Sequence, residues 1–187
     1  MEFDKDLQSI QQVRNLMAKA VVAQKTFARF SQEAVDKVVA EIAAACAENS
    51  VMLAKMAAEE TGFGVWQDKV LKNMLGSTMT YEHIKNLKTV GFIKEDKENG
   101  IYEVGVPMGV VAALIPSTNP TSTTMYKALI SVKAGNAIVI SPHPNAKNCI
   151  IKTAEIIESA AKRAGAPNGL IQCITLPTME ATDALLK

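Results

Sequence analysis

The most constraining feature of the sequence is a run of six apolar residues, Val110–Ile115, because two further apolar runs and intervening helical segments follow it. A strand that is apolar on both faces is typical of the centre of a parallel sheet. The second half of the chain therefore predicts β-α-β-α-β-α, with right-handed crossovers. After the first strand, its expected elements are a helix over 121–133, a strand over 137–140, a helix over 145–163, a strand over 170–174 and a last helix from about 178.

Glycine residues mark where two of these helices are expected to stop. Gly135 and Gly165 each follow a helical segment, where glycine commonly terminates a helix. The result is half of a doubly wound sheet, and three strands would leave a wide edge bare. We therefore expect the sequence to be incomplete relative to the working protein, or to need a partner that covers the edge.

The first hundred residues predict helices. Apolar side chains recur at the helical period, Ser31 is a candidate N-cap, and further helices are expected over 53–60 and 67–87. Charged residues and Asn99–Gly100 indicate a loop or hairpin turn before a short strand at 101–106. The predicted α/β organisation is a helical region over 1–100, which includes the start of a hairpin, and a Rossmann-like half domain over 101–187.

The composition narrows the class of protein. The 187 residues carry a formal net charge of +1, which argues against a nucleic-acid binder. No apolar run is long enough to cross a bilayer, and residues 1–6 lack the pattern of a secretory signal. The three cysteines form no CxxC pair. Free thiols in a reducing cytoplasm are the expectation.

The segment after the first strand is a candidate catalytic loop. Residues 116–124 place hydroxyls and one carboxamide, that of Asn119, between two prolines and directly before a helix. A fixed amide donor beside a helix N-terminus can stabilise an oxyanion, by roughly 3 kcal/mol per donor in acyl-transfer enzymes. The alternative is that these polar residues simply cap the helix and turn the chain.

The segment after the second strand, Ser141–Pro144, is a candidate anion site. It leads into a helix whose free N–H groups could hold a phosphate, with His143 adding a hydrogen bond. The alternative is a surface histidine in a rigid turn.

Several other sites lack support in the sequence. The chain has neither GxGxxG after a strand nor GxxxxGK[ST]. His83 and His143 are far apart and the cysteines are scattered, so no metal site is expected. We expect Cys46, Cys149 and Cys173 to be core residues rather than nucleophiles.

Three segments together resemble the aldehyde dehydrogenase superfamily. They are Val106–Val111, Ile115–Pro120 and Ala134–Val139, whose order and spacing fit its PxGVV, PxNxP and GN motifs. The Pro-Ser-Thr-Asn-Pro-Thr-Ser-Thr variant and Ser-Pro-His-Pro resemble its coenzyme A-acylating branch. That branch includes acetaldehyde and propionaldehyde dehydrogenases and the N-terminal half of bifunctional aldehyde-alcohol dehydrogenases.

This resemblance implies oxidation of a short-chain aldehyde to its acyl-CoA with NAD, or the reverse, through a cysteine thioester. It implies that Asn119 holds the oxyanion. It also implies that Ser141 replaces a lysine that hydrolytic members direct at the adenosine ribose. The residues that the resemblance assigns to cofactor binding are Leu114, Ile115, Pro116, Ser117, Thr118, Ser141, Pro142 and His143.

The family's nucleophilic cysteine has no counterpart among the three cysteines here, so we expect this chain alone to be inactive. Two alternatives are a non-catalytic nucleotide-binding module and a structural or assembly piece. The resemblance further implies a homo-oligomer, which in some relatives is packed in a bacterial microcompartment. The amphipathic segment Leu7–Met17 could dock there, although ordinary packing explains it equally well.

Overall fold

A parallel sheet of three strands organises the molecule. The computed structural model describes residues 4–187, so the first three residues of the segment tested for a secretory signal lie outside it. The strands are β3 (Val110–Ile115), β4 (Ala137–Pro142) and β5 (Ile171–Cys173), in the order β3-β4-β5. The predicted alternation of strands and helices is confirmed. In the described part of the chain, β3 and β5 each have one unpaired edge, as the sequence predicted for so small a sheet.

The prediction that Val110–Ile115 is the central strand is wrong for this chain. All six residues of β4 are buried, whereas Ala112 and Leu114 of β3 are exposed. The centre belongs to β4 because β3 and β5 both pair with it. Apolar residues on both faces of a strand therefore did not by themselves place it in the middle of the sheet.

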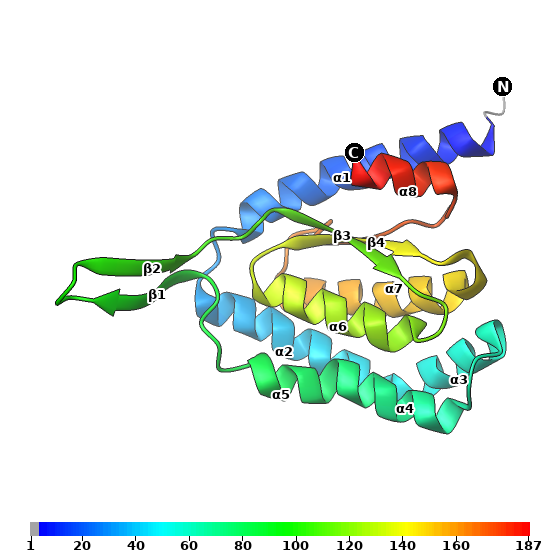
Figure 1. The fold of residues 1–187 in the computed structure, drawn as a ribbon, viewed down its shortest axis with the longest axis horizontal. Helices are drawn as coiled ribbons and strands as arrows, with labels where there is room; N and C mark the ends of the chain where they lie inside the picture. Colours follow the sequence, from blue (N-terminus) through cyan, green and yellow to red (C-terminus); the bar gives the residue numbers. More distant parts are fainter. Residues whose placement is uncertain (1–3) are drawn as a thin grey trace.

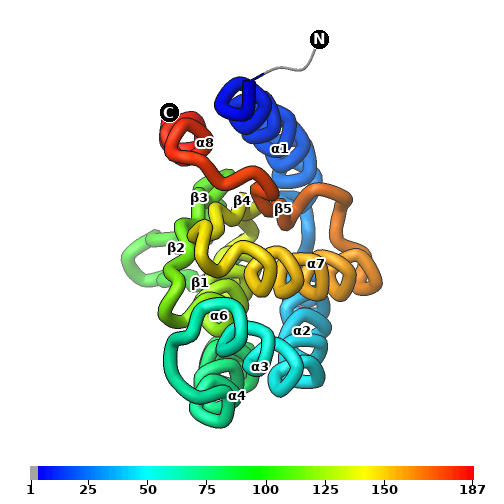
Figure 2. Tube along the Cα trace, turned by 90° about the vertical axis from the view of Figure 1, so that its right-hand side faces the viewer, coloured from blue at the N-terminus to red at the C-terminus, as the bar shows by residue number. Residues whose placement is uncertain are grey.

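Helices cover both faces of the sheet (Figures 1 and 2). On one face lie α6 (Pro120–Lys133) and α7 (Lys147–Arg163). On the other lies α1 (Lys5–Phe27), which also packs against α8 (Met179–Leu186). The predicted stop of α6 at Gly135 is confirmed: its φ of +76° is a left-handed conformation that favours glycine.

The inner side of α1 packs in the ordinary way. Val13, Ala20 and Phe27 are buried, and the Ser9 and Thr178 hydroxyls lie 2.7 Å apart, which joins α1 to the start of α8. Gln12 Oε1 also accepts hydrogen bonds from two backbone N–H groups just before α8. Packing therefore accounts for the buried face of the first helix, whereas Leu7 is 52% exposed and the docking of Leu7–Met17 stays a prediction.

A second layer of helices covers α6 and α7 on the side away from the sheet (Figure 1). The Ser31 N-cap is confirmed, because its hydroxyl accepts a hydrogen bond from the N–H of Ala34. The single helix predicted over 67–87 is instead broken by a π-helical segment and ends at Ile84. The elements are α2 (Gln32–Glu48), α3 (Ser50–Thr61), α4 (Trp66–Met74), η1 (Leu75–Met79) and α5 (Thr80–Ile84).

A two-stranded antiparallel hairpin projects from this body (Figure 1). It consists of β1 (Gly91–Asp96) and β2 (Ile101–Gly105), and its turn contains Asn99 and Gly100, as the sequence predicted. Phe92 and Tyr102 are exposed and pack edge to face across it. Within residues 4–187, no helix combines the length and the hydropathy needed to cross a bilayer.

Candidate functional site

The two predicted loops leave neighbouring strands at the same edge of the sheet. Leu114 is paired with Ser141, and Ile115 with Pro142, in the parallel register of β3 and β4. The N–H of His143 donates a 3.1 Å hydrogen bond to the carbonyl of Ile115. The structure thus brings the candidate catalytic loop and the candidate anion loop side by side at the carboxyl ends of the strands, where open α/β sheets bind ligands.

Asn119 ends the first loop and is the residue that precedes α6. Pro120 occupies the first helical position, which suits a residue that has no N–H to donate. The side chain of Asn119 makes no capping hydrogen bond to α6. The alternative that this amide merely caps the helix is therefore not what the structure shows.

Three side chains of α4 form hydrogen bonds with the first loop. Lys69 Nζ donates a 3.0 Å hydrogen bond to the carbonyl of Thr118, and Lys72 Nζ donates one of the same length to Oδ1 of Asn119. Asn73 Oδ1 accepts a 2.7 Å hydrogen bond from the hydroxyl of Thr121. These three residues were not predicted from the sequence. Their i, i+3, i+4 spacing, which places polar groups on one helix face, was the available signal.

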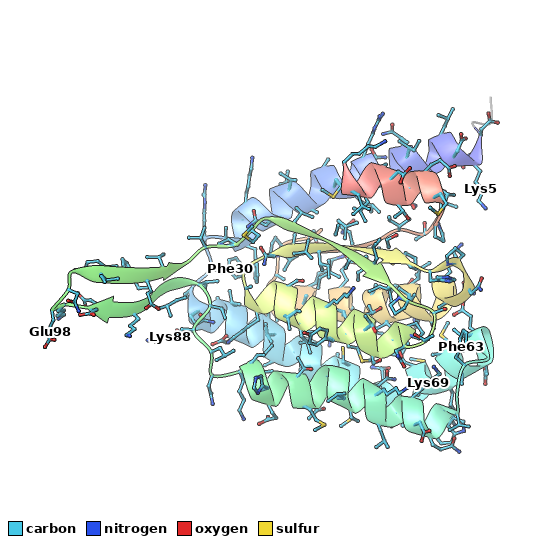
Figure 3. All side chains as sticks on the ribbon, in the orientation of Figure 1. Lys5, Phe30, Phe63, Lys69, Lys88 and Glu98 are labelled. Carbon is cyan, nitrogen blue, oxygen red and sulfur yellow. The ribbon has the colours of Figure 1, made fainter. Side chains whose placement is uncertain are left out.

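Lys69 is the buried member of this set, with 5% of its surface exposed (labelled in Figure 3). Burial lowers the pKa of its ammonium group, and the neighbouring Lys72 lowers that pKa further. Thr118 supplies the only hydrogen bond that the structure gives the ammonium within residues 4–187. Lys69 therefore attaches α4 to the backbone of the loop directly before Asn119.

The contact from Lys72 fixes which way the Asn119 amide points. An ammonium group has three donors and no acceptor, so the amide atom that faces it must be the oxygen. The amide nitrogen is then turned away from Lys72, and within the described residues Nδ2 has no partner. A positioned donor with no internal acceptor is what the oxyanion role requires.

A cleft of about 500 Å³ lies beside this amide. Its walls are the end of α4 with η1 and the first turns of α6. The two walls approach closely at Gly76, where a Cβ atom would lie 2.5 Å from the carbonyl oxygen of Ser122. The lining residues are Lys72, Leu75, Gly76, Thr80, Asn119, Ser122, Thr123 and Tyr126.

The second loop departs from its prediction in two ways. Ser141 and Pro142 are the last residues of β4 rather than loop residues, and both are buried. A 3₁₀ turn, η2 (Pro144–Ala146), then delays the helix, so that α7 begins at Lys147 rather than at 145. His143 is exposed, and its Nδ1 accepts a hydrogen bond from the N–H of Asn145.

The start of α7 already holds an anion that belongs to the protein. The two carboxylate oxygens of Glu60 accept hydrogen bonds of 2.8 and 2.7 Å from the N–H groups of Asn148 and Cys149. These are groups that the sequence analysis expected to be free for a phosphate. They are occupied because Glu60, at the end of α3, supplies the negative charge that a helix N-terminus favours.

The backbone of β3 near the first loop is held by its surroundings. The ammonium group of Lys127, on α6, donates a 2.7 Å hydrogen bond to the carbonyl of Leu114. The side chain of Leu114 is 45% exposed, whereas Ile115 is buried. The end of the strand thus presents an exposed apolar side chain, Leu114, whose carbonyl is held by Lys127.

Cys46 and Cys149 are buried, as the sequence predicted for core residues, whereas Cys173 is partly buried. Burial raises the pKa of Cys46 and of Cys173 to about 12, with Glu155 adding to the shift at Cys173. Burial also raises the pKa of Cys149, and the hydrogen bond and negative charge of Glu60 raise it further. Within residues 4–187, no group of three or more His, Cys, Asp or Glu side chains is arranged to hold a metal ion.

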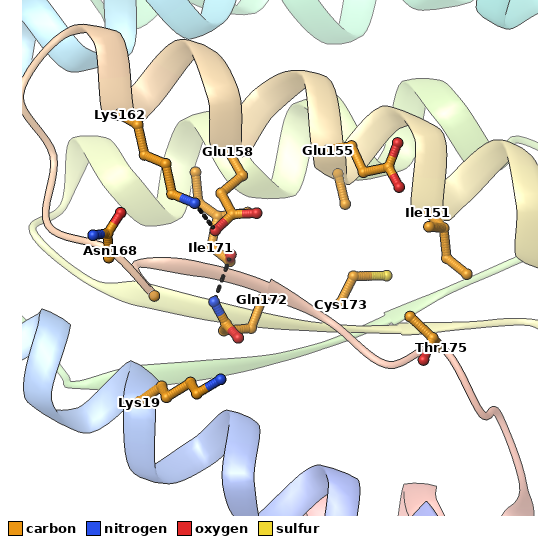
Figure 4. A pocket seen from close by; sticks show the side chains of 12 residues that line it. Lys19, Ile151, Glu155, Glu158, Lys162, Asn168, Ile171, Gln172, Cys173 and Thr175 are labelled. Atoms are coloured by element: carbon orange, nitrogen blue, oxygen red, sulfur yellow. Dashed lines mark hydrogen bonds and ion pairs between the residues drawn. The ribbon is translucent and has the colours of Figure 1, made fainter.

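A second hollow, of about 540 Å³, runs along the unpaired edge of β5 (Figure 4). It is lined by α7, β5 and Lys19 of α1, and the ion pair between Lys162 and Glu158 crosses its rim. None of the site residues predicted from the sequence lines it. The cleft beside Asn119 is therefore the candidate functional site.

Comparison with known proteins gives a consistent picture. The sequence model of the aldehyde dehydrogenase family matches residues 6–187. The chain is 57% identical to a probable aldehyde dehydrogenase from Listeria monocytogenes, with a TM-score of 0.98, over 99% of this chain and 41% of that one. It is 54% identical to an acetylating aldehyde dehydrogenase from Geobacillus thermoglucosidasius, also with a TM-score of 0.98, over 100% of this chain and 41% of that one.

A curated relative shows the same partial coverage. The chain is 42% identical over 178 residues to the bifunctional aldehyde-alcohol dehydrogenase AdhE of Escherichia coli, which is 95% of this chain and 20% of that protein. The chain therefore spans between a fifth and two fifths of the length of these relatives.

Proposed function

Because the chain belongs to the aldehyde dehydrogenase family, we propose that it is the amino-terminal part of an NAD-dependent, CoA-acylating aldehyde dehydrogenase that acts on a short-chain aldehyde. The observation that carries this proposal is the Asn119 amide, whose nitrogen is held without an internal partner beside a cleft at the ligand-binding edge of the sheet. The similarity to an acetylating enzyme supports the choice of the acylating branch.

Asn119 would act on the oxygen of the aldehyde. When a cysteine thiolate attacks the carbonyl carbon, the C=O electron pair moves to the oxygen, which becomes an oxyanion. A donor fixed next to that oxygen stabilises the transition state more than the ground state, and removing one such donor costs about 10²–10³ in kcat. The thiolate would come from polypeptide outside these residues, because burial raises the pKa of all three thiols here.

The proposal places a flat cofactor ring, rather than a phosphate group, at the ends of the strands. Bound NAD would accept a hydride, and CoA would accept the acyl group. Leu114 offers apolar surface, with Ile115 to Thr118 following it at the rim, and the backbone there is fixed by Lys127. Ser141 is 5% exposed and Pro142 is buried, so His143 is the exposed one of the three residues that the resemblance assigns to cofactor binding there.

The partners follow from the same proposal. They are an aldehyde, CoA and further copies of the same protein, and the exposed apolar side chains of the projecting hairpin support an oligomer. The protein would lie in the cytoplasm, where it would be packed inside a bacterial microcompartment; only the resemblance to the family supports this location.

The experiment is a comparison of variants in the whole protein that contains this segment. Asn119→Ala should lower the CoA-dependent formation of NADH from acetaldehyde by about 10²–10³-fold in kcat. Asn15→Ala, on the exposed side of α1, is the control and should leave the rate unchanged. Residues 1–187 alone should show no turnover.

If the whole protein does not oxidise the aldehyde, the proposal that it is an aldehyde dehydrogenase is wrong. Titration with NAD and with CoA then separates the two alternatives: binding would favour a non-catalytic nucleotide-binding module, and no binding would favour a structural or assembly role.

A further inference from the structure

We propose that Lys72 is the positioning residue that sets the orientation of the Asn119 amide, and so leaves its N–H groups free to donate beside the cleft. This inference rests on the proposed function and deepens it, because it names the group on which the oxyanion site depends. It starts from one contact, the 3.0 Å hydrogen bond from Lys72 Nζ to Asn119 Oδ1.

The helix that carries Lys72 is itself firmly attached. Asn73 is fully buried, and its Nδ2 donates a 2.9 Å hydrogen bond to the carbonyl of Ser50 while its Oδ1 accepts from Thr121. Lys69, one turn earlier, holds the backbone of Thr118. Thr118 and Thr121 flank Asn119, so two contacts fix the loop and leave the third, from Lys72, to act on the side chain.

The third contact is needed because an asparagine side chain has two nearly isosteric orientations. Its terminal torsion is broad and roughly two-fold, and a half turn exchanges Oδ1 and Nδ2. With Oδ1 toward the cleft, the amide would meet a developing negative charge with a carbonyl oxygen. With Oδ1 bound to the ammonium, the N–H groups are turned away from Lys72 and are left free to donate.

The charge on Lys72 also strengthens the donor that it orients. A cation at Oδ1 draws electron density from the amide, so the N–H groups at the other end become more polarised, as in other chains of hydrogen bonds. Lys72 lies on the wall of the same cleft as Asn119, so the effect reaches the place where the oxyanion would form.

The first test is the steady-state kinetics of the whole enzyme with acetaldehyde, CoA and NAD. Lys72→Met keeps most of the length of the side chain and removes its charge and donors. We expect kcat to fall about tenfold, the scale of one lost charge-assisted hydrogen bond, with KM for the aldehyde nearly unchanged. Lys72→Arg keeps a charged donor and should restore kcat to within about threefold of the unchanged enzyme.

The decisive test is a double-mutant cycle. If Lys72 acts through Asn119, then Lys72→Met should have no effect in the Asn119→Ala background, because there is no amide left to orient. An effect of the same size in both backgrounds would overturn the proposal. So would a rise in KM for CoA or NAD without a fall in kcat, because Lys72 would then be a contact to the cofactor.

Two controls separate this inference from the proposed function and from misfolding. Lys37→Met removes a lysine from the exposed side of α2 and should leave both kinetic constants unchanged. A crystal structure of the Lys72→Met enzyme should show an unchanged loop with the amide turned or mobile. If the unchanged enzyme oxidises the aldehyde and Lys72→Met leaves kcat unaltered, only the inference fails. If the unchanged enzyme has no such activity, the proposed function itself fails.

Discussion

Two helices begin at the same edge of the sheet, and their first turns are organised in opposite ways. The start of α7 is satisfied from within, because the carboxylate of Glu60 accepts hydrogen bonds from the N–H groups of Asn148 and Cys149. The start of α6 has no side-chain cap, and the residue before it, Asn119, is held by its oxygen, with its nitrogen turned away from Lys72 and without a partner in residues 4–187. At the start of α7 a carboxylate satisfies two N–H groups, whereas at the start of α6 the amide donors of Asn119 have no partner within residues 4–187.

The difference shows why residue type alone is a weak guide to a site. Both loops contain prolines and polar residues before a helix, and both are candidates on that ground. What separates them is a remote side chain: a carboxylate fills one helix start, whereas an ammonium group at the other can only take the amide oxygen. The sign of the charge on the remote side chain therefore decides which groups remain unpaired. The negative Glu60 binds N–H groups, whereas the positive Lys72 binds the amide oxygen and leaves the amide N–H groups without a partner in residues 4–187.

The largest expected effect comes from Asn73→Leu, which removes the link between α3, α4 and the first loop. The buried carbonyl of Ser50 and hydroxyl of Thr121 would both lose a partner. The free energy of unfolding should fall by about 3 kcal/mol, measured by urea denaturation. Adding Thr121→Val should recover part of the loss, since one unsatisfied group is then gone; a full-sized loss in the double variant would contradict this account.

The next effect comes from Gly76→Ala, in the wall of the cleft. Alanine favours a helix by about 1 kcal/mol over glycine, so propensity alone predicts a more stable protein. The new Cβ would lie 2.5 Å from the carbonyl of Ser122, so we expect a loss of about 2 kcal/mol instead. A rise in the thermal unfolding midpoint would show that α6 and η1 can separate.

A smaller effect is expected at the other helix start. Glu60→Gln keeps the shape and one acceptor oxygen but removes the charge, so the protein should lose about 1 kcal/mol. Glu59→Gln, an exposed change at the neighbouring position of α3, is the control and should stay within about 0.5 kcal/mol. Equal losses in both variants would mean that the charge of Glu60 does not stabilise α7.

The smallest effect is expected in thiol chemistry. The pKa of Cys149 is raised by burial and by Glu60, so at pH 8 its thiol should resist iodoacetamide in the folded protein and react in urea. The thiols of Cys46 and Cys173, with pKa values of about 12, should likewise resist iodoacetamide in the folded protein and react in urea. Because these pKa values lie above the ordinary 9.0, the thiols favour folding below pH 9, and that contribution is lost as the pH rises toward 12. Rapid labelling of folded Cys149, measured by mass spectrometry, would contradict the protonated state.

The sequence predicted what depends on local chemistry. Apolar runs located the strands, Ser31 began a helix and Gly135 ended one, because each acts within a few residues. It did not predict the break in the helix after Met74, where Gly76, Ser77 and Thr78 weaken helical preference but do not specify a π-helix.

The parts that the sequence missed depend on distant partners. Which strand becomes central is decided by pairing, so the apolar run of β3 could not reveal its position at the edge. Glu60 acts on residues 88 and 89 positions away, and Lys72 on one 47 positions away. No periodicity reports such contacts. Asn119 could be singled out because a lone carboxamide between two prolines is unusual in itself.

The contact between α1 and α8 has a consequence for how the protein is made. The Ser9 and Thr178 hydroxyls that meet there are 169 positions apart, and the strands that α1 packs on come from beyond residue 109. On a ribosome that adds about 5–20 residues per second, the first helix would wait roughly ten seconds or longer for its last neighbour. During that time the side chains of Val13, Ala20 and Phe27 would face water, which makes the emerging first helix a natural client for a chaperone.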